Sequence, residues 1–324
     1  NAYRHRFMTA SILVTDNQKE IDIARASYLG GRTECFAIGN YAGEFYYLDV
    51  NSMYPSVMSA ESYPIRLRGV YGHPTFREIR KWLSHLAVIA DVVIAATDPA
   101  YPIVLDGKLV FPQGRFRAIL CGPELQYALD HGHIESMRSA AVYDQAPIFK
   151  QFISWAFAAR VNAREAKNTV YDWLIKIFMN SLYGKFGQRG RVFETVGQCA
   201  PDLVEVWPSV NHDTKEVTHY RRFGGLEQVW VEEGESRESV PSIASYVTSY
   251  ARMKMHRAIM KAGRDHCLYC DTDSLVVDHT GYERLLDEIH PTKLGAWNLE
   301  KVIKTFQIFG PKDYIMDGDI KSKG

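Results

Sequence analysis

The pattern of apolar and polar residues divides the chain into strand-like stretches on either side of a strongly helical block. Residues 41–50 (YAGEFYYLDV) and 269–277 (YCDTDSLVV) are rich in aromatic and β-branched residues and predict strands. Between residues 149 and 187, apolar residues recur at three- and four-residue spacing, with a turn and N-cap at Asn168. The pattern therefore predicts a helical hairpin. Residues 242–263 predict another amphipathic helix, which ends at a glycine.

Three aspartates interrupt the predicted strands or stand at their ends. Asp49 closes the first strand, and Asp271 and Asp273 lie within the second. Burial of an ionised carboxylate is unfavourable unless the group is paired or binds a metal. Two interpretations are open: a site for a hard cation such as Mg²⁺, which prefers oxygen ligands, or an ordinary hairpin turn with solvated side chains.

Charge and composition narrow the function classes only slightly. The 324 residues carry no formal net charge, which excludes a generally basic nucleic-acid coat but leaves room for a local basic surface. Residues 150–191 are such a region, with eight basic and two acidic side chains, although a solvated helix face would explain them equally. No run of about 18 apolar residues predicts a membrane span. We expect an intracellular protein.

One face of the second predicted helix of the hairpin carries a candidate binding surface. Lys176, Asn180, Tyr183 and Gly184 follow one another at helical spacing and share that face. A lysine there can act as a point charge for a triphosphate, and a glycine allows close approach to the tyrosine ring. The alternative is a tyrosine packed in the core beside an exposed lysine.

Five short motifs, taken together, resemble those of family B DNA polymerases. DVNSMYPS (49–56), KIFMNSLYGKFG (176–187) and YCDTDS (269–274) look like motifs A, B and C in the right order. YLGG (28–31) and KDY (312–314) resemble the Y-x-G-G and K-x-Y elements of the protein-primed branch of phages and linear plasmids. Joint matches in order are more specific than any single motif.

The resemblance implies an α+β fold, with an antiparallel palm sheet flanked by helices and an inserted helical-hairpin fingers region. It implies template-directed nucleotidyl transfer from a dNTP to a primer or terminal-protein hydroxyl, using two Mg²⁺ or Mn²⁺ ions. The implied partners are primer-template DNA, dNTPs and a terminal protein, with no membrane. The catalytic residues implied are Asp49, Asp271 and Asp273, with Asp49, Val50 and Asp273 on metal. The implied nucleotide-binding residues are Val50, Tyr54, Arg164, Lys176, Asn180 and Tyr183. The implied DNA-binding residues are Tyr28, Gly30, Gly31, Thr272, Ser274, Lys312 and Tyr314.

The same resemblance divides the chain into five parts. They are an N-terminal segment with motif A (1–58), an insertion like terminal-protein region 1 (59–148), the fingers (149–187), a strand-displacement-like insertion (188–240) and the palm with motif C and K-x-Y (241–324). The long intervals between motifs also fit ordinary subdomain elaborations. Too few residues flank the motifs for the family's exonuclease and thumb domains, so we expect a partial chain that does not proofread.

Two alternatives remain from the sequence. A metal-dependent nuclease could use the same aspartates but would not need Lys176, Asn180 and Tyr183 on one helix face. A non-catalytic remnant that binds DNA or terminal protein would bind DNA in a salt-dependent manner without incorporating dNTP. A reverse transcriptase fits less well, because the aspartates of D-T-D are not adjacent.

Overall fold

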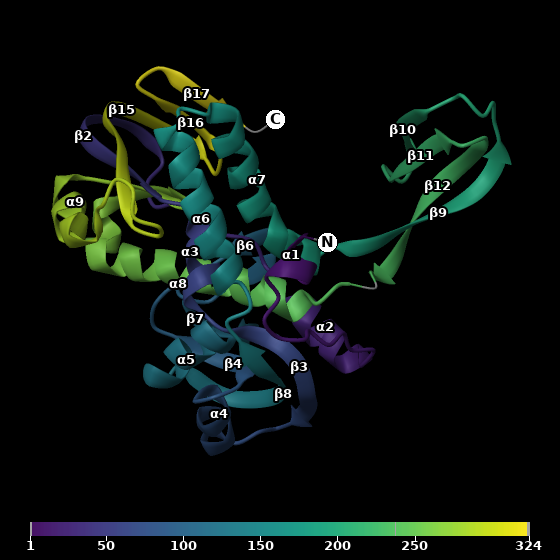
Figure 1. Cartoon of the computed structure of the whole chain (residues 1–324). Helices are drawn as coiled ribbons and strands as arrows, with labels where there is room; N and C mark the ends of the chain where they lie inside the picture. The colour runs from purple at the N-terminus through teal and green to yellow at the C-terminus, as the bar shows by residue number, and fades with distance from the viewer. Residues whose placement is uncertain (1, 237, 323–324) are drawn as a thin grey trace.

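The computed structural model describes residues 2–236 and 238–322, and its centre is an antiparallel sheet of seven strands in the order β1-β13-β14-β2-β15-β16-β17 (Figure 1). The strands are β1 (Thr33–Cys35), β2 (Gly39–Val50), β13 (Cys267–Asp271), β14 (Ser274–Val277), β15 (Trp297–Gly310), β16 (Asp313–Met316) and β17 (Asp319–Ser322). Strands from both ends of the sequence therefore pair in one sheet, which we call the palm sheet. The predicted α+β fold with an antiparallel sheet is confirmed.

Helix α8 (Pro241–Ala262) packs beneath this sheet, and most of its side chains are buried. Leu48 and Val50 of β2, Leu275 of β14 and Trp297 of β15 form one apolar cluster with Met255 of the helix. Burial of this apolar face is the main force that holds sheet and helix together. The remaining elements around the palm sheet are α3 (Met53–Ala60), η1 (Arg264–His266), α9 (His279–Leu285) and η2 (Leu286–Glu288).

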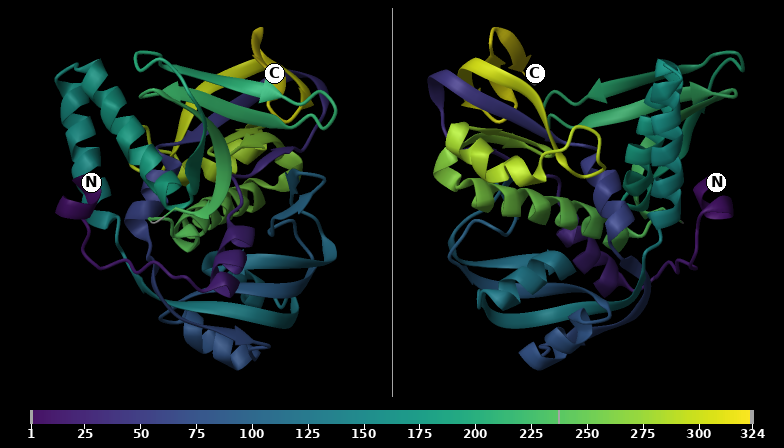
Figure 2. Two further views of the ribbon diagram at one scale, coloured as in Figure 1. Left: turned by 90° about the vertical axis from the view of Figure 1, so that its right-hand side faces the viewer. Right: turned by 60° about the vertical axis from the view of Figure 1, so that its left-hand side comes forward.

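A second antiparallel sheet, built between residues 63 and 146, packs on the other side of α8 (Figures 1 and 2). Its strand order is β3-β8-β4-β7, with β3 (Tyr63–Gly72), β4 (Ala87–Ala96), β7 (Gly114–Cys121) and β8 (Ile134–Ala146). Helices α4 (Phe76–Leu83) and α5 (Gly122–Asp130) and the hairpin of β5 (Ile103–Leu105) and β6 (Lys108–Val110) complete it. We call this part the inserted unit. Its core is formed by the central strand β4 and by α5.

The predicted helical hairpin is present as α6 (Lys150–Glu165) and α7 (Thr169–Phe186), which stand against each other above α8 (Figure 1). The Asn168 side chain caps α7 by accepting a hydrogen bond from the amide of Tyr171. Among the described side chains of α7, the fully buried ones are Ile175 and Met179, in the middle of the helix. The outer part of the hairpin is therefore solvated.

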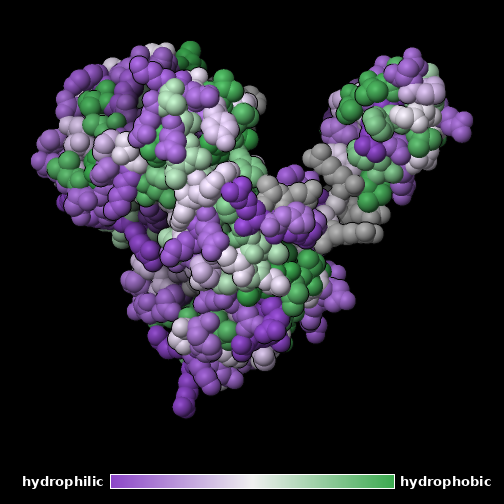
Figure 3. All heavy atoms as spheres, viewed as in Figure 1, coloured by the Kyte–Doolittle hydropathy of each residue, from purple (hydrophilic) through white to green (hydrophobic). Residues whose placement is uncertain are grey.

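A four-stranded sheet in the order β10-β11-β12-β9 projects from the body (Figure 1). Its strands are β9 (Arg189–Gln198), β10 (Glu205–Val210), β11 (Val217–Phe223) and β12 (Leu226–Glu235). Hydrophobic and polar residues are mixed on its visible face, and Val204, Val206 and Phe223 are exposed (Figure 3). Nothing else in the described chain covers this part of the sheet.

The chain begins with α1 (Ala2–Arg6) and α2 (Gln18–Ser27), and α2 packs against α8 and the inserted unit. Residues 28–32 then lead from α2 into the palm sheet. Among the described residues, no helix combines the length and the apolar character that a membrane crossing requires.

Candidate active site

Strand pairing in the palm sheet brings Asp49 beside the turn that contains Asp271 and Asp273. Strands β2 and β14 are antiparallel with Asp49 opposite Ser274, and the Val50 amide donates to the Asp273 carbonyl at 2.8 Å. Two apolar strands therefore place carboxylates from distant parts of the sequence side by side, where β2 ends and β14 begins. We call residues 271–274 the catalytic turn, after the role that the resemblance to family B polymerases implies for its two aspartates.

The catalytic turn holds a conformation that costs backbone energy. Thr272 has φ +60°, a left-handed conformation that is uncommon for a threonine. Its amide donates to the Arg32 carbonyl at 2.7 Å, and its hydroxyl donates to Asp271 at 3.1 Å. The Ser274 hydroxyl donates to the Asp271 carbonyl at 3.2 Å. These bonds hold the residues on both sides of Asp273 in place.

Asp49 and Asp273 are both harder to ionise than an ordinary aspartate. Burial raises the pKa of Asp49 to about 7, with further contributions from Asp273 and Glu300 and an opposing one from Lys176. Burial also raises the pKa of Asp273, with a further contribution from Asp271, while Lys176 and Lys312 act against that shift. Two half-buried carboxylates that repel one another form an oxygen site that a hard divalent cation would relieve. The residues therefore fit a metal, although no group of three His, Cys, Asp or Glu side chains in the described chain is arranged so that it could hold a metal ion.

Asp271 has a different environment from the other two aspartates. Its two carboxylate oxygens accept hydrogen bonds from Lys312 Nζ at 2.7 and 2.6 Å. The Thr33 hydroxyl of β1 adds a third bond at 2.9 Å. Asp271 thus anchors the lysine of the K-x-Y element to the catalytic turn, and its charge is already compensated within the protein.

The K-x-Y element comprises Lys312, in the turn between β15 and β16, and Asp313 and Tyr314, at the start of β16. Lys312 has φ +63°, and its amide donates to the Tyr269 hydroxyl at 3.0 Å. The Tyr314 ring packs against Tyr269 at 5.1 Å between ring centroids. The element therefore presents a half-buried lysine and tyrosine beside the catalytic turn.

Helix α7 brings the predicted face of the fingers to the same place. Lys176 is exposed. Its positive charge opposes the rise in the pKa of both Asp49 and Asp273, so Lys176 lies close enough to interact with both carboxylates. Asn180 and Tyr183 are half-buried one and two turns further on. The Tyr183 ring packs on Tyr54 of α3 with 4.6 Å between centroids. The face predicted from helical spacing thus points toward the carboxylates.

Arg164 of α6 is exposed at the outer end of the fingers and pairs with Asp172 of α7 at 3.2 Å. Asp172 also binds Arg160 at 2.6 Å, and Arg160 reaches down to donate to the Ser52 hydroxyl at 3.1 Å. Ser52 lies within motif A and has φ +55°. Arg160 therefore links the fingers to motif A, a contact that the residue spacing did not reveal.

The Y-x-G-G loop, residues 28–31, touches both the fingers and the catalytic turn. The Tyr28 ring lies against Gly187, where a Cβ would collide with it. A Cβ on Gly31 would lie 2.8 Å from the Thr272 side chain, whereas a Cβ on Gly30 would point into open space. The loop thus needs glycine at position 31 for a close approach to the turn.

Glu300 is a second residue that the sequence analysis missed. The register of β15 against β2 shifts between Leu299 and Lys301, and this irregularity sets Glu300 near Asp49, whose pKa it raises. No motif marks it, because its position depends on a β-bulge in long-range pairing. Arg160 was missed because nothing in the sequence distinguishes it from the exposed arginine of the same helix, and its burial is seen only in the structure.

The fold of this chain is that of a DNA polymerase palm with fingers and insertions. The structure of phi29 DNA polymerase complexed with primer-template DNA and incoming nucleotide aligns with a TM-score of 0.67 and 20% identity, covering 97% of this chain and 54% of that one. The complex with primer-template DNA alone gives 0.66.

Sequence comparison places the chain within a family. Residues 1–199 match the DNA polymerases of type B, organellar and viral, and the chain belongs to this family. The predicted resemblance to family B polymerases is thereby confirmed. A DNA polymerase of Enterobacteria phage PRD1 is 27% identical over 93% of this chain and 52% of its own length. A probable DNA polymerase of Neurospora intermedia is 23% identical over 96% of this chain and 32% of its own length. The chain spans about half or less of the relatives it matches.

Proposed function

We propose that this chain carries the polymerisation centre of a DNA-directed DNA polymerase, which transfers a nucleotide from a dNTP to a primer 3′-hydroxyl and releases pyrophosphate. The observation that carries the proposal is the convergence of Asp49, Asp273 and Lys176 at one edge of the palm sheet. Carboxylates alone would also suit a nuclease. A basic fingers helix over them suits a triphosphate.

Asp49 and Asp273 would hold the divalent cations, Mg²⁺ or Mn²⁺, together with the main-chain carbonyl of Val50. When two such ions are bound, they favour ionisation of the attacking hydroxyl and neutralise the leaving pyrophosphate. The raised pKa values of the two carboxyl groups support this assignment, because an uncompensated pair of this kind is unfavourable.

The fingers would bind the triphosphate and the base of the incoming nucleotide. Lys176 is exposed and free to act as a point charge, while Arg164 would exchange Asp172 for phosphate oxygens. Asn180 and the packed rings of Tyr183 and Tyr54 would form the floor on which sugar and base rest. The tyrosine pair is rigid, which suits discrimination of a 2′-hydroxyl by sterics.

The elements around the catalytic turn would hold DNA. Lys312 and Tyr314 would hold the primer terminus, and Tyr28, Gly30 and Gly31 the template, with Thr272 and Ser274 between them. The phi29 polymerase structures with primer-template DNA and nucleotide support these partners.

The parts of the chain would divide the work as in the protein-primed branch. The inserted unit would correspond to the region that contacts a terminal protein, whose hydroxyl would replace the primer. The projecting sheet β9–β12 would correspond to the strand-displacement insertion. The change from β8 to α6 near residue 148, from α7 to β9 near residue 187 and from β12 to α8 near residue 240 supports this division, whereas residue 58 lies within α3.

The test is single-nucleotide extension of a primed template with Mg²⁺ and each dNTP in turn, for the native chain and for Asp273→Ala. We expect incorporation of the nucleotide complementary to the template base, a matching change when that base is changed, and loss of incorporation in the variant. DNA binding by both proteins serves as the control. Binding without any templated incorporation by the native chain would contradict the proposal.

A further inference from the structure

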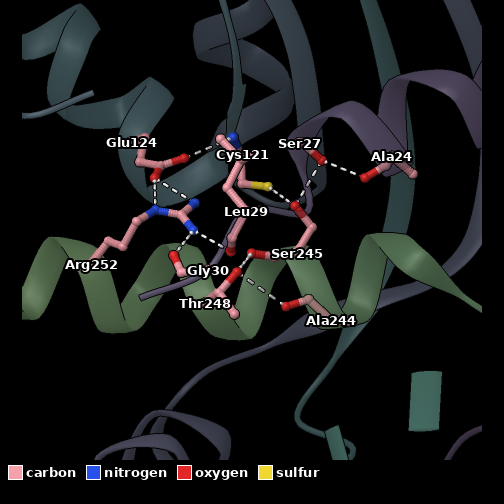
Figure 4. Close-up of polar contacts among 10 residues, drawn as sticks. All are labelled: Ala24, Ser27, Leu29, Gly30, Cys121, Glu124, Ala244, Ser245, Thr248 and Arg252. Atoms are coloured by element: carbon pink, nitrogen blue, oxygen red, sulfur yellow. Dashed lines mark hydrogen bonds and ion pairs between the residues drawn. The ribbon is translucent and has the colours of Figure 1, made fainter. Parts of the chain in front are cut away.

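The loop 28–31 is held in place by a buried arginine of α8. Arg252 Nη1 donates to the carbonyl of Leu29 at 2.7 Å and to that of Gly30 at 2.9 Å (Figure 4). The arginine side chain is only 1% exposed. Two carbonyls of a surface loop are thus bound by one charged group from the centre of the fold.

Arg252 is in turn fixed by Glu124, at the start of α5 in the inserted unit. Nε and Nη2 of the arginine lie 2.9 and 2.8 Å from Glu124 Oε1, and the glutamate side chain is 1% exposed. The other carboxylate oxygen accepts the Cys121 amide at 3.3 Å, in a capping box. A buried ion pair contributes little net stability, but it fixes geometry, since either partner left alone is strongly unfavourable.

A second set of contacts joins the same three elements beside this pair. The Ser245 hydroxyl of α8 lies 2.7 Å from that of Ser27 at the end of α2 and 2.9 Å from the Cys121 sulfur (Figure 4). The end of α2, the start of α5 and the middle of α8 therefore meet at one buried polar junction. The loop 28–31 leaves directly from it.

The far end of the loop joins the catalytic turn. The Arg32 carbonyl accepts the Thr272 amide at 2.7 Å, and the Arg32 guanidinium is buried over the Phe111 ring of the inserted unit at 4.3 Å. Gly31 packs on the Thr272 side chain. A shift of the loop would consequently move the turn that carries the aspartates.

We propose that Glu124 and Arg252 are positioning residues for the loop 28–31 and for the template strand that the loop would hold. Where they place the loop relative to the catalytic turn depends on the position of the inserted unit. This inference rests on the proposed polymerase function. Neither side chain reaches the surface, so neither would touch substrate. They would act through the two loop carbonyls, and the inserted unit would thereby influence how the template is held.

The test replaces the whole pair, in the variant Glu124→Leu/Arg252→Met, because an apolar pair of similar size keeps the core packed. We expect its affinity for single-stranded template to fall about tenfold, as for loss of hydrogen bonds from a charged donor. The KM for dNTP at saturating DNA should change less than the template affinity, since the hydrogen bonds removed are those that Arg252 makes to the loop and to Glu124. Hydrogen exchange of residues 28–34 should accelerate, while that of β4 should not.

The matched control is Asp91→Leu/Arg117→Met, which removes a bidentate ion pair of the same inserted unit that does not contact the loop. It should leave template affinity unchanged. If the double variant at the junction folds poorly, Arg252→Lys keeps the charge but not the forked geometry and should give a smaller effect in the same direction.

Native template affinity and native loop exchange in the Glu124→Leu/Arg252→Met variant would overturn the inference. Absence of primer extension by the native chain would instead contradict the proposed function. Template binding and hydrogen exchange would still decide whether the pair positions the loop, because neither measurement needs catalysis.

Discussion

Removal of the Asp49 charge should stabilise the metal-free protein, although Asp49 is a metal ligand in our proposal for catalysis. In the folded chain the pKa of Asp49 is about 7, against 3.8 for an unperturbed aspartate. The native state therefore binds this proton more tightly than the unfolded state. As the pH rises from 3.8 through about 7, the free energy of unfolding falls. Above that range the protein has lost all the stability that the protonated Asp49 gives to the folded state.

The magnitude follows from the size of the shift. Three pKa units correspond to about 4 kcal/mol, which is an upper bound for a residue that keeps some contact with water. We expect Asp49→Asn to be more stable than the native chain by about 2 kcal/mol at pH 8 in EDTA, and the difference to vanish near pH 4. Addition of Mg²⁺ at pH 8 should narrow the difference, because it stabilises only the native chain.

The assay is urea unfolding between pH 4 and pH 8, followed by circular dichroism, with the linear dependence on urea used for extrapolation. Asp271→Asn is the control, because it breaks the ion pair with Lys312 and should destabilise the protein at pH 8. If Asp49→Asn were less stable than the native chain at pH 8 without metal, the reasoning about the carboxylate pair would be refuted.

Two further predictions concern the fingers and the loop. Arg164→Ala, which leaves the ion pair between Arg160 and Asp172 in place, should raise the KM for dNTP severalfold in primer extension, and an unchanged KM would contradict the role given to Arg164. Gly31→Ala should destabilise the protein by about 1–3 kcal/mol and slow incorporation, because its Cβ would meet Thr272 at 2.8 Å. Gly30→Ala, with open space around the new methyl group, should leave the stability unchanged, and equal destabilisation by the two substitutions would argue against a close approach at Gly31.

The fold could be predicted from the sequence where a local pattern carried the information. The period of the fingers helices and the cap at Asn168 predicted the hairpin, and the aromatic and β-branched residues around Asp49 and Asp271 predicted strands. The order of the palm strands could not be predicted in this way. It depends on long-range pairing, such as β15 against β2, that no local period encodes.

The candidate site shows the same division. Helical spacing alone brought Lys176 and Tyr183 to one face, as the structure has them. The partner of Asp271 was not foreseen, because Lys312 arrives from a separate hairpin 41 residues further along the chain. Glu124 and Arg252 were missed for a related reason. Charged residues within amphipathic helices are normally solvated, and only tertiary packing shows that these two are buried against each other.

The measurement that tests the account most directly is Mn²⁺ binding, followed by electron paramagnetic resonance of the free ion, in the native chain and three asparagine variants. The account predicts that Asp49→Asn and Asp273→Asn each weaken Mn²⁺ binding by at least about tenfold, whereas Asp271→Asn leaves it nearly unchanged because that carboxylate is bound to Lys312. Native Mn²⁺ affinity in Asp49→Asn and Asp273→Asn, or an equal loss in all three variants, would contradict it.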